Sequence, residues 1–276
     1  MLKILTLNLW HDAGPWAARA DRIRSWIDRL DPDLIGLQEA LRGPDFDQVA
    51  ELLGDRPYHC DYVCASPFWR DATGDGRPVR EFGNAVASRW PIERRDTLSL
   101  PDAADGETRA ALSVTVASPH GPLSFTCTHL SWKFHHGEVR ERQVVALCDW
   151  VRARRPRDGF PSLVVGDFNA EPRAAEIRYV TGLQSLAGRS VAFLDAWRVA
   201  GDGGPGITWS NRNPYAATEC EPDRRIDYVF ADLPARLTGV GRIERCAVVA
   251  DVERDGVWPS DHFGVYAELR TEPLAG

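Results

Sequence analysis

The sequence has no long apolar run and almost no lysine. No segment approaches the roughly 18 consecutive apolar residues of a membrane-spanning helix, so we expect no membrane span. Lys3 and Lys133 are the only lysines among 33 basic residues, and the formal net charge is −7. A chain with this charge has no overall basic field to attract nucleic acid or an anionic membrane, although a local basic groove is not excluded.

The sequence shows no cysteine framework, and we expect no leader peptide. Its six cysteines are scattered, which predicts buried, reduced thiols in a cytoplasmic protein. The N-terminal stretch MLKILTLNLW carries one lysine, has polar Thr6 and Asn8 inside its apolar run, and contains no small-residue cleavage site. We therefore interpret it as a first β-strand and not as a signal peptide.

The chain does contain enough apolar sequence for a large core. With 276 residues, 43% of them hydrophobic, it is expected to form one domain over residues 1–276 and to act as a monomer. Helical periodicity predicts helices over 16–30 and 137–155, whereas short apolar runs bounded by turn residues predict strands. The strand-like runs are 3–10, 32–40, 83–91, 111–118, 123–130, 162–169, 207–211, 225–231, 245–252 and 261–270.

Many strands with few helices between them indicate an α/β fold in which sheets pack on each other and helices cover the outside. Residues 64–82 and 199–224 follow neither periodicity, and loops of this length are usually functional or mobile. The sequence does not assign a role to either loop.

Polar side chains stand at the ends of several predicted strands. Asp167 and Asn169 directly follow the apolar run 163–165. An Asx turn would explain this pair alone, but so many polar groups at strand ends would be costly to bury separately, so we expect them to converge on one site. The set comprises Asn8, Glu39, His129, Asp167, Asn169, Asp227, Asp261 and His262. Oxygen donors dominate it, which suits a hard ion such as Mg²⁺ or Mn²⁺.

The order of these motifs resembles the endonuclease/exonuclease/phosphatase superfamily of metal-dependent phosphoesterases. The resemblance extends over essentially the whole chain, through LTLNLW, LIGLQE, GNAVASRWPI, TRAALSV, THL, GDFNAEP, RIDYVF and SDHFGV. THL alone is a weak signal, but the order and spacing of all the motifs are specific. The resemblance implies a sandwich of two mixed β-sheets flanked by helices, with the site at one edge between the sheets.

The resemblance also implies a role for each matching residue. Glu39 would be the principal ligand of Mg²⁺ or Mn²⁺, with Asn8 and Asp261 beside it. Asp167 would orient and deprotonate the attacking water, and Asn169 would contact the phosphate. His262, held by Asp227, would bind the scissile phosphate and stabilise its developing charge. Such a site neutralises negative charge as it spreads over the phosphoryl oxygens.

His129 narrows the resemblance to the deoxyribonuclease, sphingomyelinase and inositol-phosphatase branches, which have this histidine. By the same resemblance His129 acts near the leaving-group oxygen and pairs with a carboxylate from an earlier strand, which by motif position is Glu81. Arg109 matches an arginine that approaches the substrate phosphate. Glu81 and Arg109 could equally form a surface ion pair of little energetic value.

The substrate stays open at this stage. We expect a phosphoester, with diesters preferred over monoesters; the alternatives are a nuclease specific for DNA or RNA and a catalytically silent binding module on the same fold. A nuclease should have a basic track beside the cleft, for which Arg70, Arg77, Arg80 and Lys133 are candidates. A small-molecule or lipid-headgroup enzyme would instead line its cleft with aromatic side chains, and the available ones are Trp10, Trp69, Trp132, Trp209 and Tyr215.

Overall fold

A seven-stranded mixed β-sheet forms one half of the structure, a computed structural model that describes residues 1–68, 80–156 and 158–274. Its strands follow the order β12-β13-β1-β2-β5-β4, and β3 pairs with β2. β1 and β2 are parallel and the other pairs are antiparallel. The bounds are β1 Leu2–Asn8, β2 Leu34–Gly43, β3 Phe46–Asp47, β4 His59–Phe68, β5 Arg80–Ser88, β12 Ile243–Val249 and β13 Gly264–Leu269.

A six-stranded mixed sheet forms the other half, in the order β10-β11-β9-β8-β7-β6. Here β8 and β9 are the parallel pair. The bounds are β6 Ile92–Ser99, β7 Ala110–Ser118, β8 Gly121–His129, β9 Phe160–Asp167, β10 Leu194–Asp195 and β11 Asp227–Ala231. Each sheet therefore carries one parallel pair near its centre, and both pairs contribute residues to the predicted site.

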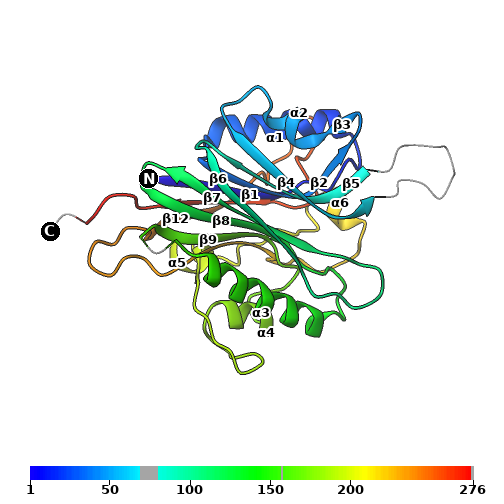
Figure 1. Ribbon diagram of the computed structural model, residues 1–276. Helices are drawn as coiled ribbons and strands as arrows, with labels where there is room; N and C mark the ends of the chain where they lie inside the picture. Colours follow the sequence, from blue (N-terminus) through cyan, green and yellow to red (C-terminus); the bar gives the residue numbers. More distant parts are fainter. Residues whose placement is uncertain (69–79, 157, 275–276) are drawn as a thin grey trace.

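Helices cover the outer faces of the two packed sheets (Figure 1). α1 (Trp16–Leu30) and α2 (Gln48–Leu53) lie over the seven-stranded sheet, while α3 (Gly137–Arg154) and α4 (Ala175–Val180) lie over the six-stranded sheet. The remaining helices are short: α5 (Ala196–Ala200) and α6 (Pro214–Ala217). This order of layers confirms the predicted sandwich of two mixed sheets flanked by helices.

Strand alternation supplies both the central core and the two outer cores. Ile4 packs between the sheets with Val165, whereas its neighbour Leu5 faces the opposite side and packs under α1. At Gly36 the sheets approach so closely that an added Cβ would lie 2.5 Å from Val165 Cγ2. The period of two along each strand therefore determines which residues join which layer.

The predicted helices are confirmed to within one residue, but the strand predictions need correction. The sequence analysis did not predict β4 and β6, which are edge strands. In β6, six of the eight residues carry a charge or a hydroxyl group, as is common in edge strands, so the sequence shows no clear apolar–polar alternation there. The run 207–211 is not a ladder strand, since Trp209 forms only isolated bridges, to Arg224 and His262. The predicted 199–224 loop is irregular over most of its length, and it contains the end of α5, the short helix α6 and these bridges.

All six cysteines are free thiols. Cys127, Cys148 and Cys246 are buried, as predicted, whereas Cys60, Cys64 and Cys220 are exposed because they lie on the edge strand β4 and in the loop after α6. Within the described part of the chain, no helix has the length and apolar character needed to cross a membrane.

Candidate active site

The predicted site residues lie at one end of the two sheets, around a cleft of about 300 Å³. β8 and β9 are parallel and both end here, which places His129 beside Asp167 in register. β11 is antiparallel to β9 and starts at this end, so Asp227 lies opposite Asp167 in the ladder, on the side of β9 away from β8. Sheet pairing therefore brings together three side chains from distant parts of the sequence.

Glu39 reaches the cleft from a β-bulge in β2. Between Leu37 and Ala40 the pairing of β2 with β5 shifts by one residue, and Glu39 itself has a φ of 57°. The left-handed region is strained for a residue with a side chain, and bulges often re-aim a side chain beside a functional site. The bulge gives the Glu39 carboxylate its place in the cleft lining.

Asn8 ends β1 and connects two of the predicted functional carboxylates. Its Nδ2 donates to Glu39 Oε1 at 3.2 Å and to Asp167 Oδ2 at 3.1 Å, while its Oδ1 accepts from the Trp10 backbone N–H at 2.9 Å. Asn8 therefore presents N–H groups to these carboxylates while its oxygen faces the Trp10 backbone, which corrects its prediction as a metal ligand. This arrangement couples the predicted metal ligand to the predicted general base.

His262 lies among carboxylates. Its Nδ1 is 2.9 Å from Asp227 Oδ2, and its Nε2 is 3.7 Å from Asp167 Oδ2. Burial disfavours the charged imidazole, yet attraction from Asp227, Asp167 and Asp261 raises the pKa of His262 well above its usual range. The contact with Asp227 is the one that the resemblance implies, and the binding of a phosphate by His262 stays a prediction.

Asp167 has the environment of a base that titrates near neutrality. Its Oδ1 accepts from the Asn169 backbone N–H at 2.8 Å. Burial raises the pKa of Asp167 to about 7, and repulsion from Asp227 acts in the same direction. A buried carboxyl with a pKa close to the working pH suits general base catalysis.

His129 has the opposite environment to His262. Arg109 Nη1 lies 2.9 Å from its Nδ1, and its Nε2 lies 3.0 Å from Asn169 Nδ2 and 3.4 Å from Asp167 Oδ2. A guanidinium can only donate, so Nδ1 accepts and the ring proton of the neutral imidazole lies on Nε2. At Nε2 the acceptor is Asp167 Oδ2, whereas the Asn169 amide nitrogen is itself a donor, to the Leu130 carbonyl. Burial, and then repulsion from Arg109 and His262, lowers the pKa of His129 well below its usual value.

The predicted pairing of His129 with Glu81 is not present in the structure. Glu81 is exposed on β5, opposite Arg42 of β2 and Pro67 of β4. The prediction placed Glu81 by its position in the motif of β5 alone. The chain that leads into β7 instead brings Arg109 against the His129 ring. Arg109 is not a surface residue either, because it is 7% exposed and pairs with Glu107.

Asp261 and Glu39 are the two carboxylates predicted to hold a divalent cation, and both line the cleft. Ser260 Oγ donates to the Asn8 backbone carbonyl at 2.7 Å and lies 3.0 Å from Asp261 Oδ1, which fixes this loop beside β1. Burial raises the pKa of Asp261 to about 6; His262 lowers it and repulsion from Glu39 raises it further. Two repelling carboxylates that face one cleft suit a hard divalent cation, so the donor set fits the predicted Mg²⁺ or Mn²⁺.

Arg19 was missed by the sequence analysis although it supports the metal side of the cleft. This arginine of α1 is fully buried and donates to the backbone carbonyls of Leu9, Trp10, His11, Ala13 and Pro259 at 2.8 to 3.2 Å. It thereby ties the turn after Asn8 to the loop before Asp261. No spacing signal distinguishes it from the other arginines of the sequence.

The rim of the cleft is aromatic and acidic. Trp10, Trp132 and Trp209 line it together with Glu219 and Glu221. Trp10 stacks on Tyr215 with ring centroids 4.8 Å apart, and Trp132 is 51% exposed. Trp69 lies outside the described residues.

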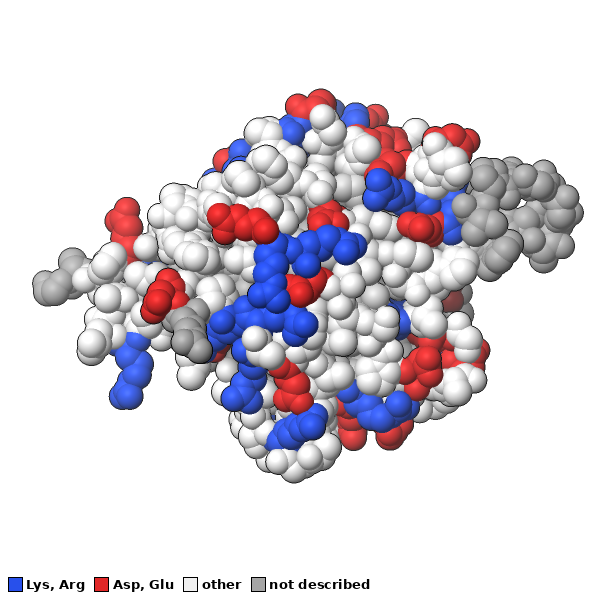
Figure 2. Space-filling view, in the orientation of Figure 1, with Lys and Arg blue, Asp and Glu red and all other residues white. Residues whose placement is uncertain are grey.

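The predicted basic track is only partly within the described residues. Arg70 and Arg77 lie outside them, while Arg80 pairs with Asp12 at 2.7 Å and Lys133 pairs with Asp105. On the face shown in Figure 2, basic side chains are likewise interspersed with acidic ones. The described cations near the cleft are therefore neutralised by carboxylates.

Fold and site together define a phosphoesterase-like sandwich protein, and comparison with known proteins agrees. Residues 5–262 match the model of the Endonuclease/Exonuclease/phosphatase family. This chain belongs to that family, whose members are typically phosphoesterases that depend on a divalent metal. No match is found among curated protein sequences.

Solved structures with this fold include an endonuclease/exonuclease/phosphatase from Beutenbergia cavernae, which is 27% identical, with a TM-score of 0.69 over 98% of this chain and 71% of that one. The human Nocturnin catalytic domain with bound sulfate is 19% identical, with a TM-score of 0.71 over 97% and 93% of the two chains. TDP2 from Caenorhabditis elegans is 16% identical, with a TM-score of 0.68 over 98% and 74%. At these lower identities the similarity concerns the fold.

Proposed function

We propose that this protein hydrolyses a phosphodiester with the help of a divalent cation, with Asp167 as the base that activates water. The observation that carries the proposal is the contact set around Asp167. Its carboxylate is buried, is held by Asn8 and Asn169, and lies 3.7 Å from the His262 imidazole. This places a proton acceptor next to a cation that can bind the oxygen of a substrate phosphate.

Each residue of the site has its own role in the proposed reaction. Asp167 takes the proton from the attacking water, while His262, oriented by Asp227, donates from Nε2 to a phosphoryl oxygen. Asn169 and Arg109 face the same phosphate and fix its position. A Mg²⁺ or Mn²⁺ ion held by Glu39 and Asp261, with Asn8 orienting Glu39, would add charge stabilisation on the phosphoryl oxygens.

The charge of the cleft favours a diester over a monoester. A phosphomonoester carries nearly two negative charges at neutral pH, whereas a diester carries one. The arginines of the described lining, Arg109 and Arg224, are paired with Glu107 and Glu221. With Glu39, Asp167 and Asp261 also in this lining, the arginines add little free positive charge to that of the proposed metal ion and His262, which favours a monoanion over a dianion.

The same rim favours a compact substrate over an extended nucleic acid. Binding of a polynucleotide gains most of its affinity from cations along the backbone, and the described cations beside this cleft are already paired. The aromatic residues Trp10 and Trp132 instead offer flat apolar surface. We therefore place small organic diesters ahead of DNA and RNA.

A substrate panel tests the proposal. Purified protein is assayed with bis-p-nitrophenyl phosphate, sphingomyelin, inositol phosphates, plasmid DNA and RNA, each with Mg²⁺, Mn²⁺ or EDTA. Asp167→Asn and His262→Ala should each lower turnover by at least roughly 10²-fold, the lower end of what general base catalysis supplies. A loss below tenfold in both variants would remove these residues from the chemistry, and equal rates in EDTA would remove the cation.

A further inference from the structure

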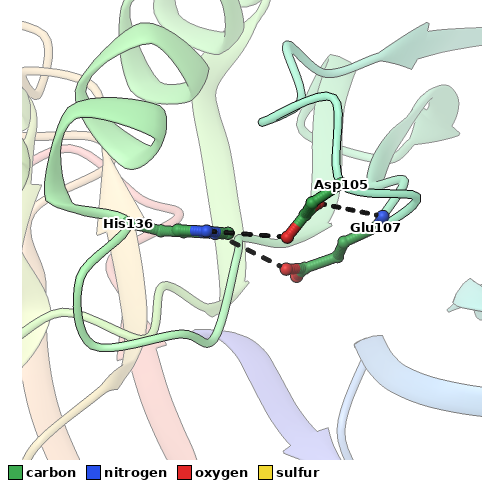
Figure 3. A group of neighbouring side chains, drawn as sticks. All are labelled: Asp105, Glu107 and His136. Carbon is green, nitrogen blue, oxygen red and sulfur yellow. Dashed lines mark hydrogen bonds and ion pairs between the residues drawn. The ribbon is translucent and has the colours of Figure 1, made fainter.

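Two loops meet beside the candidate active site and bring Asp105, Glu107 and His136 together (Figure 3). Their ligand atoms lie within 4.8 Å of one another, a spacing that could suit a metal ion. The carboxylates already have partners, however: Asp105 pairs with Lys133, and Glu107 with Arg109. The cluster therefore functions as a hydrogen-bonded network rather than as a cation site.

Glu107 is the centre of this network because both of its oxygens are engaged. Oε1 accepts from Arg109 Nε at 2.8 Å, and Oε2 accepts from Ser131 Oγ at 3.0 Å. His136 Nδ1 lies 2.8 Å from Ser131 Oγ and 3.6 Å from Glu107 Oε2. Arg109, Ser131 and His136 are all buried, so this ion pair is shielded from the solvent that weakens surface pairs.

The network continues from Arg109 into the active site. Nε of Arg109 is held by Glu107, and Nη1 of the same guanidinium donates to His129 Nδ1 at 2.9 Å. An arginine side chain has many rotamers, and a second anchor on its planar guanidinium reduces that freedom before substrate binds. Without Glu107, Arg109 would keep its charge but lose the contact that directs it toward the ring.

We propose that Glu107 is a positioning residue that, through Arg109, holds His129 with its proton on Nε2 and aims the guanidinium at the substrate phosphate. This inference rests on the proposed function for its catalytic consequence. Its structural consequence, the state of the His129 ring, does not depend on any activity. The competing explanation is a latch in which Glu107 only joins residues 101–108 to the start of α3.

Two measurements on Glu107→Gln separate these explanations. The first is the nitrogen-15 spectrum of histidine-labelled protein, in which the Nδ1 signal of His129 reports its hydrogen bond; His129→Ala assigns that signal. We expect the signal to shift in Glu107→Gln, and to shift less in Ser131→Ala, which removes one donor to Glu107. Glu244→Gln is the matched control, since Glu244 accepts from Arg270 at 2.6 Å on β12, outside the cleft lining. It should leave the signal unchanged.

The second measurement is a double-mutant cycle in kcat/KM with the diester that the wild type cleaves best. Glu107→Gln should lose roughly tenfold, and Glu107→Gln with Arg109→Gln should lose no more than Arg109→Gln alone, because residues that act through one contact are not additive. Ser131→Ala gives the same comparison if Glu107→Gln does not fold.

The outcomes decide the proposal clearly. An unchanged His129 signal in both variants, or additive losses in the cycle, would overturn the positioning role and leave the latch. If the wild type cleaves none of the substrates, the proposed function fails, yet the His129 signal still tests whether Glu107 sets the state of this ring.

Discussion

Arg109 Nη1 lies 2.9 Å from His129 Nδ1, so a guanidinium and not the predicted Glu81 carboxylate holds this nitrogen of the ring. His262 has the reverse arrangement, with Nδ1 2.9 Å from Asp227 Oδ2. Two histidines at one site are thus driven in opposite directions: the pKa of His129 is lowered, first by burial, and the pKa of His262 is raised by its carboxylates. Environments that separate two titrating groups in this way often assign them different roles.

The first prediction concerns the role of His129. A neutral imidazole with its proton on Nε2 donates a hydrogen bond but does not readily release a proton to a leaving group. We therefore expect His129→Ala to lower kcat/KM by a similar factor, within about threefold, for alkoxide and p-nitrophenolate leaving groups. A much larger loss for the alkoxide substrate would restore the role near the leaving-group oxygen that the sequence resemblance implies.

The second prediction concerns pH. A base must be deprotonated to act, and burial raises the pKa of Asp167 above its usual value to about 7. Activity should therefore be lost as pH falls, with an acid limb between about 4, the ordinary carboxyl value, and 7, because a bound cation lowers the pKa of a nearby carboxyl. The profile of kcat/KM against pH at saturating metal measures this limb.

A substitution at Asn8 tests whether Asp167 sets this acid limb. Its hydrogen bond to Asp167 Oδ2 lowers the pKa of that carboxyl, so Asn8→Ala should move the acid limb to higher pH. A limb that stays in place, or moves down, would show that Asp167 does not set the pH dependence.

The third prediction concerns the metal. EDTA should abolish activity, and Mg²⁺ or Mn²⁺ should restore it. Glu39→Gln keeps an oxygen for the Asn8 amide but loses the charge, so metal affinity should fall by more than roughly 100-fold, beyond the 10 to 100-fold typical of a residue that only orients a ligand. Calorimetric titration measures the affinity, with Glu244→Gln as control and circular dichroism to verify folding. Unchanged affinity would place the ion elsewhere.

The fourth prediction concerns stability. Arg19 satisfies five backbone carbonyls, and a lysine has only three donors in a different geometry. Arg19→Lys should lower the free energy of unfolding by about 2 to 4 kcal/mol, since buried carbonyls lose their partners. Urea unfolding measures the change against Arg236→Lys, an exposed position. Equal midpoints for the two variants would contradict this account of Arg19.

The layered fold and most of the site were predictable because they depend on local pattern. The short apolar run 163–165, bounded by Pro161 and Gly166, marks a strand buried on both faces, so Asp167 and Asn169 were placed at its carboxyl end before any contact was known. The helix 16–30 followed from its apolar stripe in the same way. Edge strand β6 did not, because its backbone pairs with β7 while its charged side chains give no period.

Only the tertiary structure determines which polar groups are in contact with each other. The sequence alone determined the order of the layers, the strand ends and the oxygen-rich donor set, since hydrophobic periodicity and side-chain chemistry are properties of short segments. It did not determine that Arg109 rather than Glu81 reaches His129, that Asn8 joins Glu39 to Asp167, or that Arg19 ties two distant loops. Those contacts depend on strand register and on a bulge at Glu39. A shift of one residue in either would exchange the partners, and no local pattern encodes it.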